Sequence, residues 1–283
     1  MKKYAIIGHS LGHTLSPNIH ERLFKLSGIE AEYVKMDIPP EELKNKYDEL
    51  AELDGFNITI PHKISIIDYC NKLSTGAQQY GSVNCIRNEG DVKYGFNTDI
   101  LGFRKSIDLL GANLSSRVLL IGCGGVGRMM AIETALFNGD LTIAVLKQGL
   151  EAAQEVVSEI KKMNPEARVR IVTIKGNVVS PSDFDEMPVF DLVMNASPVG
   201  MFPKVDNMPC DEEILYGAGY VFDVVYNPRD TLLVKTAGKL GIRAMSGMAM
   251  LVFQAVVAHG IWNNSKFKDE DIKTLISDME ALV

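Results

Sequence analysis

The sequence predicts an α/β protein of two domains, the second of which is doubly wound around a mostly parallel sheet. Two observations support this fold class. From about residue 105 onward, short apolar runs alternate with helical segments, which is the pattern of βα units. One of these runs, Val118–Ile121, ends in the glycine-rich turn Gly122–Gly127 and opens into a helical segment. We therefore expect a domain boundary near residue 105.

The glycine-rich turn fits the G-x-G-x-x-G pattern of a strand, a tight turn and a helix. Gly122 permits the sharp turn, Gly124 lets a pyrophosphate approach bare backbone, and Gly127 lets the helix pack closely on the strand. The N-terminus of the helix then favours an anion. Glycines also gather in purely structural turns, but the flanking strand and helix favour a Rossmann-type nucleotide-binding domain.

The remaining elements follow from hydrophobic periodicity and turn residues. Expected strands are residues 4–7, 31–36, 55–63 (running into a turn), 117–121, 141–146, 169–174, 192–195 and 221–224, with a hairpin over 81–87 and 92–99. One helix is expected to start at Ser16. Further helices are expected over residues 41–50, 100–110, 126–138, 151–162, 248–262 and 269–282. Strands separated by helices imply parallel crossovers, whose carboxyl ends collect ligands.

Composition and charge exclude several classes of protein. Hydrophobic residues make up 46% of the 283 residues and charged ones 23%, as in soluble globular proteins, and no apolar run is long enough to span a bilayer. The net charge of -7, without a Lys/Arg stripe, argues against nucleic acid as a partner. The four cysteines show no C-x-x-C spacing and the N-terminus does not read as a signal peptide, so we expect a cytoplasmic protein.

Two hydroxyl residues precede the first predicted helix. Thr14 and Ser16 would suit a carboxylate, because they lie beside a helix N-terminus. Ser16 followed by Pro17 is equally typical of a plain helix cap. Both interpretations stay open.

Polar residues gather where the third predicted strand ends and where the hairpin returns. Lys63 is either a solvated lysine or one half of a buried ion pair with Asp99. Asp99 could instead be only an acidic residue in the first turn of a helix. Gln254 is an amide within a strongly apolar helix, so it needs partners inside the protein or points into a site.

Together these segments resemble the shikimate dehydrogenase family over nearly the whole chain. The matching segments are residues 12–17 (GHTLSP), 55–63 (GFNITIPHK), 81–84 (GSVN), 97–99 (NTD), 122–126 (GCGGV), 195–201 (NASPVGM), 226–228 (YNP) and 250–254 (MLVFQ). The resemblance implies a substrate-binding α/β domain over 1–104, completed by C-terminal helices over 247–283, and a dinucleotide-binding domain over 105–246. It implies the reversible reduction of 3-dehydroshikimate to shikimate by a nicotinamide cofactor.

The resemblance also implies residue roles. Lys63 and Asp99 would be the catalytic acid-base pair. Substrate ligands would be Thr14 and Ser16 for the carboxylate, Thr59, Asn84, Asp99 and Gln254 for the hydroxyls, and Tyr226 at the junction with the cofactor. The pyrophosphate would lie on Gly122, Cys123, Gly124, Gly125 and Val126, and the nicotinamide by Val224 and Gly247.

Two departures from the family pattern bear on specificity. Thr14 replaces the first serine of the usual Ser-x-Ser, and its added methyl leaves quinate open as a second substrate. The family's two arginines for the NADP 2′-phosphate are replaced, since Lys147 is the remaining cation and Glu151 is acidic. A lysine is a point charge and does not reproduce bidentate binding by arginine. We expect NADP as the cofactor with weakened preference, and NAD as the alternative.

Other functions have less support. An NAD-dependent quinate/shikimate dehydrogenase uses the same chemistry, whereas a non-catalytic nucleotide-binding regulator would need only the fold. No metal site is expected, because His9 and His13 lie on a loop and the other histidines form no ligand spacing. A G-x-S-x-G nucleophile elbow is absent from the sequence. The residues do not predict the oligomeric state, and a homodimer is compatible with them.

Overall fold

The computed structural model describes residues 1–12, 14–186 and 188–283, which form two compact units. Unit 1 comprises residues 1–102 and 251–279, and unit 2 comprises residues 103–250 and 280–283. The sequence predicts domain boundaries after residues 104 and 246. The assignment of one domain to substrate binding and of the other to dinucleotide binding stays a prediction.

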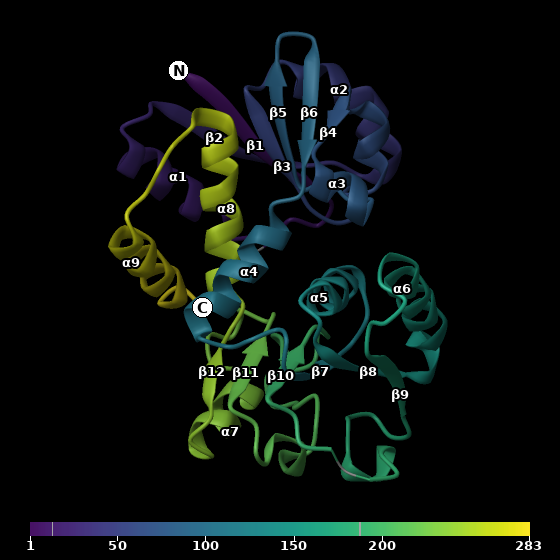
Figure 1. Cartoon of the computed structure of the whole chain (residues 1–283). Coiled ribbons are helices and arrows are strands. Elements are labelled where there is room, and N and C mark those ends of the chain that lie inside the picture. The colour runs from purple at the N-terminus through teal and green to yellow at the C-terminus, as the bar shows by residue number, and fades with distance from the viewer. Residues whose placement is uncertain (13, 187) are drawn as a thin grey trace. The chain divides into compact units, whose positions relative to one another are not determined.

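Unit 1 is built on a six-stranded mixed sheet in the order β2-β1-β3-β5-β6-β4 (Figure 1). Its strands are β1 (Lys2–Gly8), β2 (Ala31–Asp37), β3 (Gly55–Ile58), β4 (Lys72–Leu73), β5 (Cys85–Glu89) and β6 (Val92–Phe96). β1 pairs in parallel with β2 and β3, because a helix separates each consecutive pair. β5 and β6 form the predicted antiparallel hairpin, and β5 pairs antiparallel with β3.

Helices cover both faces of this sheet. They are α1 (Ser16–Ser27), α2 (Leu43–Ala51), α3 (Thr75–Tyr80), the unit 1 part of α8 (Met248–Asn263) and α9 (Asp269–Glu280). Because side chains alternate along β1, Ala5 and Ile7 pack with Leu43, Leu50 and Ala77 of α2 and α3. Tyr4 faces the other way.

The second face of the sheet carries an aromatic cluster beneath α1 and α8. Tyr4 stacks on Phe24 and on Trp262, with ring centroids 5.0 and 4.6 Å apart. Cys85 and Ala258 complete this cluster. Figure 1 places α1 and α8 together on this side of the sheet.

Unit 2 is a parallel six-stranded sheet in the order β12-β11-β10-β7-β8-β9. Its strands are β7 (Arg117–Ile121), β8 (Asp140–Leu146), β9 (Val169–Ile174), β10 (Leu192–Asn195), β11 (Tyr220–Asp223) and β12 (Arg243–Met245). Its helices are α5 (Gly125–Leu136), α6 (Leu150–Met163), α7 (Leu232–Lys239) and the greater part of α4 (Asp99–Leu110). The order reverses between β7 and β10, which is the switch point of a doubly wound fold.

The core of unit 2 lies on both faces of its sheet. Leu119, Val193 and Val221 pack with Leu233 and Ala237 of α7 on one face. α5 and α6 contact β7, β8 and β9, and Figure 1 shows them on the face opposite α7.

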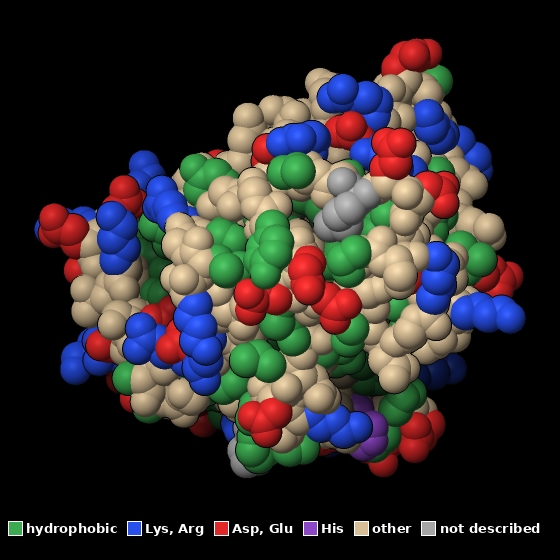
Figure 2. All heavy atoms as spheres, turned by 90° about the horizontal axis from the view of Figure 1, so that it is seen from below, with side chains coloured by type: hydrophobic (Ala, Val, Ile, Leu, Met, Phe, Trp, Pro, Cys, Tyr) green, Lys and Arg blue, Asp and Glu red, His purple; other side chains and the backbone are tan. Residues whose placement is uncertain are grey.

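The surface in Figure 2 mixes charges of both signs. Basic side chains stand singly or in small groups with acidic ones among them, and no continuous basic stripe crosses this face. In the part of the chain that the structure describes, no helix combines the length and the apolar character needed to cross a membrane.

Candidate functional site

Lys63 and Asp99 form an ion pair in unit 1. The Lys63 Nζ donates to Asp99 Oδ2 at 2.7 Å, and the two side chains are 25% and 18% exposed. β3 ends at Ile58, so Lys63 lies in the turn that follows, and its carbonyl accepts the Val83 N–H at 2.8 Å. Asp99 is the first residue of α4, where the Asn97 side chain accepts its backbone N–H. Two turns far apart in the sequence therefore hold a partly buried lysine against a carboxylate.

Asn84 connects this pair to the rest of the unit. Its Nδ2 donates to the second Asp99 oxygen, Oδ1, at 2.8 Å and to Thr98 Oγ1 at 3.0 Å. Its Oδ1 accepts the Thr98 backbone N–H at 2.7 Å. Both Asp99 oxygens thus have a fixed donor, and the carboxylate retains lone pairs for a ligand hydroxyl.

Thr98 links Asn84 to Gln254 on α8. Gln254 Nε2 donates to the Leu251 carbonyl at 3.0 Å, which turns its Oε1 toward the Thr98 hydroxyl at 3.3 Å. Thr98 is fully buried. Sequence reasoning gave it no role, although it stands inside the Asn97–Asp99 motif that carried the resemblance. Lys63, Asn84, Asp99 and Gln254 are thus joined in one hydrogen-bonded group.

Thr14 and Ser16 lie together at the start of α1. The Thr14 hydroxyl donates to Ser16 Oγ at 3.1 Å and accepts the Ser16 backbone N–H at 3.2 Å. Of the two interpretations that the sequence left open for Ser16, the plain helix cap does not hold, because Ser16 is already the first helical residue and Leu15 takes the cap position without a side-chain bond. The turn that Thr14 makes with Ser16 replaces that cap. Both hydroxyls therefore stand at the positive end of a 12-residue helix.

Thr59 lies where β1 and β3 end side by side. Its backbone N–H donates to the Ile7 carbonyl at 2.9 Å. A Cβ on Gly8 would stand 2.5 Å from the Thr59 methyl carbon, so the two strand ends are in close contact. These are carboxyl ends of parallel strands, where ligands collect.

The glycine-rich turn of unit 2 offers bare backbone at the N-terminus of α5. Gly122 has φ of +91°, which favours glycine. A Cβ on Gly124 or Gly125 would meet nothing within 4 Å, so the space above the turn is open. Burial raises the pKa of the Cys123 thiol to about 11, so this side chain is neutral at pH 7 and adds no negative charge. The turn therefore fits the pyrophosphate of a dinucleotide.

Val224 and Gly247 approach each other closely in unit 2. The Gly247 N–H donates to the Val225 carbonyl at 3.0 Å. A Cβ on Gly247 would stand 2.1 Å from the Val224 carbonyl oxygen, so only glycine fits there. Tyr226 lies two residues after Val224, and burial raises the pKa of its hydroxyl. This segment follows β11, at the same sheet edge as the glycine-rich turn after β7.

Lys147 is exposed and follows β8, the neighbour of β7 in the sheet. It opens the short 3₁₀ helix Lys147–Gly149, and the exposed Glu151 lies in the first turn of α6. Both side chains therefore stand at the edge of the sheet that carries the glycine-rich turn.

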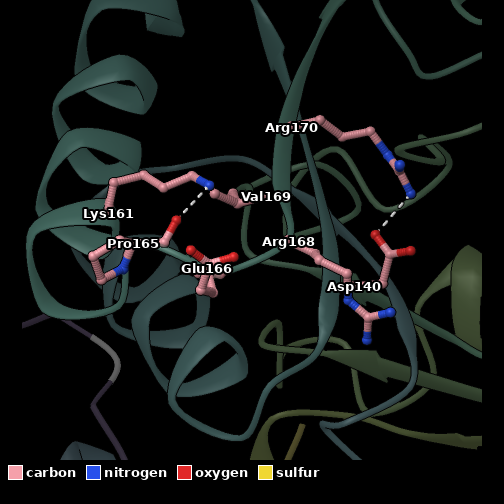
Figure 3. A pocket seen from close by; sticks show the side chains of 8 residues that line it. Asp140, Lys161, Pro165, Glu166, Arg168, Val169 and Arg170 are labelled. Carbon is pink, nitrogen blue, oxygen red and sulfur yellow. Dashed lines mark hydrogen bonds and ion pairs between the residues drawn. The ribbon is translucent and has the colours of Figure 1, made fainter.

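A hollow at the opposite end of the strands has different chemistry (Figure 3). It is lined by Asp140, Lys161, Pro165, Glu166, Ala167, Arg168, Val169 and Arg170. Asp140 and Val169 begin β8 and β9, so the hollow lies away from the carboxyl ends of the strands. Its charges have local partners: Arg170 donates to Asp140 at 2.9 Å, and Lys161 to the Pro165 carbonyl at 3.1 Å. We assign no ligand to it.

Metal ligands do not gather in the described ranges 1–12, 14–186 and 188–283, where no three His, Cys, Asp or Glu side chains could share an ion. His9 bonds Asp37 at 2.9 Å. His13 lies outside the described residues.

The fold and these residues define a two-unit α/β protein with a Rossmann-type unit and a second unit that carries a lysine–aspartate pair. Residues 6–86 match the family model described as the shikimate dehydrogenase substrate binding domain. The chain is 33% identical over 273 residues to the shikimate dehydrogenase (NADP(+)) of Caldanaerobacter subterraneus subsp. tengcongensis, covering 95% of this chain and 94% of the relative. The chain belongs to the shikimate dehydrogenase family.

Solved structures agree over the whole length. A shikimate dehydrogenase in complex with NADP+ is 31% identical with a TM-score of 0.85, covering 99% of this chain and 96% of that one. A shikimate 5-dehydrogenase from Listeria monocytogenes, in complex with shikimate and NAD, is 25% identical with a TM-score of 0.84, covering 98% and 96%. The predicted fold class is confirmed.

Proposed function

We propose that this protein is a shikimate dehydrogenase that reversibly reduces 3-dehydroshikimate to shikimate, a step toward aromatic compounds. The single observation that carries the proposal is the Lys63–Asp99 ion pair at 2.7 Å, with Asn84 bonded to the second carboxylate oxygen. A family member that had kept only the fold would have no need to hold a lysine and a carboxylate partly buried in this way.

The substrate's carboxylate and ring hydroxyls are each assigned to side chains whose polar groups can hydrogen-bond to them. Thr14 and Ser16 hold the carboxylate, supported by their hydroxyls at the positive end of α1. Thr59, Asn84, Asp99 and Gln254 hold the ring hydroxyls, and Tyr226 is assigned as a further substrate ligand. For Asn84 the hydrogen count narrows the assignment. Both Nδ2 hydrogens already have acceptors, and Oδ1 already accepts the Thr98 backbone N–H. When the Thr98 hydroxyl hydrogen points to Gln254, one Oδ1 lone pair remains, and this is what Asn84 offers to a ligand hydroxyl.

Lys63 and Asp99 are the catalytic acid-base pair. When bound, the nicotinamide cofactor supplies the hydride to the ketone carbon. The Lys63 ammonium has three hydrogens and gives one to Asp99. A remaining hydrogen faces the carbonyl oxygen, stabilises the negative charge that develops there and is transferred to it, which completes the alcohol. Asp99 keeps the ammonium in place and accepts a substrate hydroxyl. In the oxidative direction the same lysine takes the proton back.

The cofactor is held by unit 2. Gly122, Cys123, Gly124, Gly125 and Val126 bind the pyrophosphate through backbone N–H groups, which the open space above Gly124 and Gly125 supports. Val224 and Gly247 lie by the nicotinamide, and Lys147 lies at the adenosine ribose.

NADP is the assigned cofactor, with a weaker preference than paired arginines would give. The curated relative from Caldanaerobacter is named for NADP(+), whereas the Listeria structure holds NAD. In this chain Lys147, which is exposed, is assigned to the 2′-phosphate, and the exposed Glu151 stands where the family has a second cation. NAD is therefore the second candidate, supported by Glu151.

The test follows reduced nicotinamide by absorbance in four incubations of purified protein: shikimate or quinate, each with NADP+ or NAD+. We expect turnover with shikimate and less than roughly a hundredfold preference for NADP+ in kcat/KM, about 2.7 kcal/mol. A larger preference would show that Lys147 alone suffices for the 2′-phosphate.

The quinate arms test the first departure from the family, Thr14 in place of serine. Quinate turnover with NAD+ would assign the protein as a quinate/shikimate dehydrogenase. Folded protein that is silent in all four incubations would overturn the proposal in favour of a non-catalytic nucleotide-binding regulator.

We also infer a cytoplasmic location. The four cysteines Cys70, Cys85, Cys123 and Cys210 are all free thiols. Such usage is typical of a reducing compartment.

A further inference from the structure

Asp223 is a fully buried acid at the carboxyl end of β11. Its Oδ1 accepts from Asn195 Nδ2 at 2.9 Å and from the Val225 backbone N–H at 3.0 Å. Its Oδ2 accepts from the Thr231 hydroxyl at 2.7 Å. Burial raises the pKa of Asp223 to about 6, against the opposing effect of these three donors. A buried carboxylate is costly, and this one has been assigned no ligand or chemistry so far.

Each of its three partners fixes a different segment. Asn195 ends β10 and folds the loop after it, because its Oδ1 accepts the Ser197 N–H and its Nδ2 also donates to the Val199 carbonyl. Thr231 is the N-cap of α7, and its hydroxyl accepts the Val234 N–H. Val225 belongs to the segment between Val224 and Tyr226. One carboxylate therefore ties two loops and a helix start together.

These segments also contact the glycine-rich turn and Gly247. A Cβ on Gly122 would stand 3.1 Å from the Ser197 nitrogen, so the turn packs against the loop that Asn195 folds. On the other side, the Gly247 N–H donates to the Val225 carbonyl. Asp223 thus lies in a continuous set of contacts from the pyrophosphate turn to the Val224–Gly247 contact.

We propose that Asp223 is a positioning residue that holds the segment Val224–Tyr226 at a fixed place relative to the glycine-rich turn, so that the nicotinamide half of the cofactor finds its binding surface preformed. This rests on the proposed function for the assignment of Val224 and Gly247. Asp223 is fully buried and reaches the cofactor only through the backbone that it holds. The adenosine half depends on the glycine-rich turn and Lys147, which Asp223 does not bond.

The test compares two ligands on the full-length protein by calorimetry. One is NADP+, and the other is 2′-phospho-ADP-ribose, which is NADP+ without the nicotinamide. Asp223→Asn keeps the shape but removes the negative charge and replaces one acceptor oxygen with an NH₂ group, so none of the three donors faces a charged acceptor any longer and at least one of them has to change its bonding. We expect the Kd for NADP+ to rise about tenfold, the scale of one lost hydrogen bond to a charged group, and the Kd for the fragment to change less than twofold.

Glu133→Gln is the matched control. Glu133 is a buried carboxylate of unit 2, 1% exposed and bonded by Arg104. This variant should leave the ratio of the two Kd values as in the wild type. If Asp223→Asn does not fold, Thr231→Val removes one bond to the carboxylate together with the cap bond to Val234, and it should raise the NADP+ Kd about threefold with the fragment unchanged.

Several outcomes would overturn the inference. An equal change for both ligands would assign Asp223 a purely structural role, and an unchanged Kd for NADP+ in a folded variant would remove it from cofactor binding altogether. Wild-type protein that binds NADP+ but does not oxidise shikimate would overturn the proposed substrate and leave this comparison intact. Wild-type protein that binds no NADP+ would overturn both.

Discussion

At the scale of single residues, the proposed chemistry depends most on Lys63. Lys63→Ala removes the proton donor and leaves the Asp99 carboxylate partly buried without its partner. We expect kcat to fall by roughly 10²–10⁴-fold with a smaller change in the KM for shikimate. Steady-state kinetics in both directions measure the effect.

Lys44→Ala is the control for that measurement, because Lys44 is an exposed lysine on α2 of the same unit. It should keep wild-type kinetics. Near-normal turnover of Lys63→Ala would remove Lys63 from the chemistry.

The sequence raised the Lys63–Asp99 pair as one of two alternatives, and the two side chains do form an ion pair. Spacing alone could not decide between them, because 36 residues and a hairpin separate the two and a lysine after a strand is commonly solvated. The role of Thr98 could not be predicted from the sequence for another reason. Its hydroxyl matters only because Asn84 and Gln254 meet it from distant parts of the chain. For Ser16 the sequence left the helix cap open as one of two interpretations, because a cap depends on local backbone geometry that Ser-Pro alone does not fix.

At the scale of elements, the long apolar and amphipathic runs were predicted well and the short pieces were missed. Two strands of unit 2 that are rich in aliphatic residues, Arg117–Ile121 and Val169–Ile174, appear with the predicted bounds. β4 and β12 are two and three residues long, too short for a periodic signal, and exist through pairing with a neighbour. The helices α3 and α7 are likewise short and were not predicted.

A buried pair of histidines joins α1 to α8. His20 Nδ1 and His259 Nε2 are 3.1 Å apart, and the rings lie among Tyr33, Phe24 and Trp262. Burial lowers the pKa of His259 to about 3, and burial together with His259 lowers the pKa of His20 well below its usual value. Both rings are therefore neutral in the folded protein, and each stays so under mild acid.

This pair should make unit 1 sensitive to acid. In the unfolded chain a histidine binds a proton near pH 6.5, whereas in the folded unit it does not until much lower pH. The folded unit therefore has its full stability above pH 6.5, where the histidines are neutral in both states, and it loses stability as the pH falls toward 3. As the pH falls from 7 to 5, the contribution of His259 should lower the free energy of unfolding by about 2 kcal/mol. Urea unfolding of wild type and His259→Gln at both pH values measures this, and the variant should lose less.

Phe24→Leu serves as the control, because Phe24 packs on His259 with ring centroids 4.4 Å apart. It should lower stability at both pH values and keep the wild-type dependence on pH. If His259→Gln and wild type lose equal stability, the pair is not the source of the acid sensitivity.

At the scale of the whole molecule, each unit has its own sheet and its own core. Trp262, the chain's one tryptophan, lies in the core of unit 1, where its indole N–H donates to the Ile86 carbonyl at 2.8 Å. Tryptophan fluorescence therefore reports unit 1, whereas far-ultraviolet circular dichroism reports both units.

The two ligands should stabilise different transitions. NADP+ at a hundred times its Kd should add about 2.7 kcal/mol to the unfolding of unit 2 and leave the fluorescence midpoint nearly unchanged. Shikimate should raise the fluorescence midpoint. Urea titrations followed by both probes measure this. A single coincident transition that NADP+ shifts in both probes would contradict it.

The position of Trp262 also has a consequence for synthesis on the ribosome. Unit 2 comes mainly from one continuous segment, but unit 1 needs residues 251–279 to complete it. The aromatic face around Tyr4 is covered by α8, and 176 residues separate Ile86 from Trp262. At the usual pace of translation this interval lasts roughly 10–35 s. During that time α8 does not yet cover the apolar face of the nascent chain. We therefore expect chaperones at the ribosomal exit tunnel to bind this early segment.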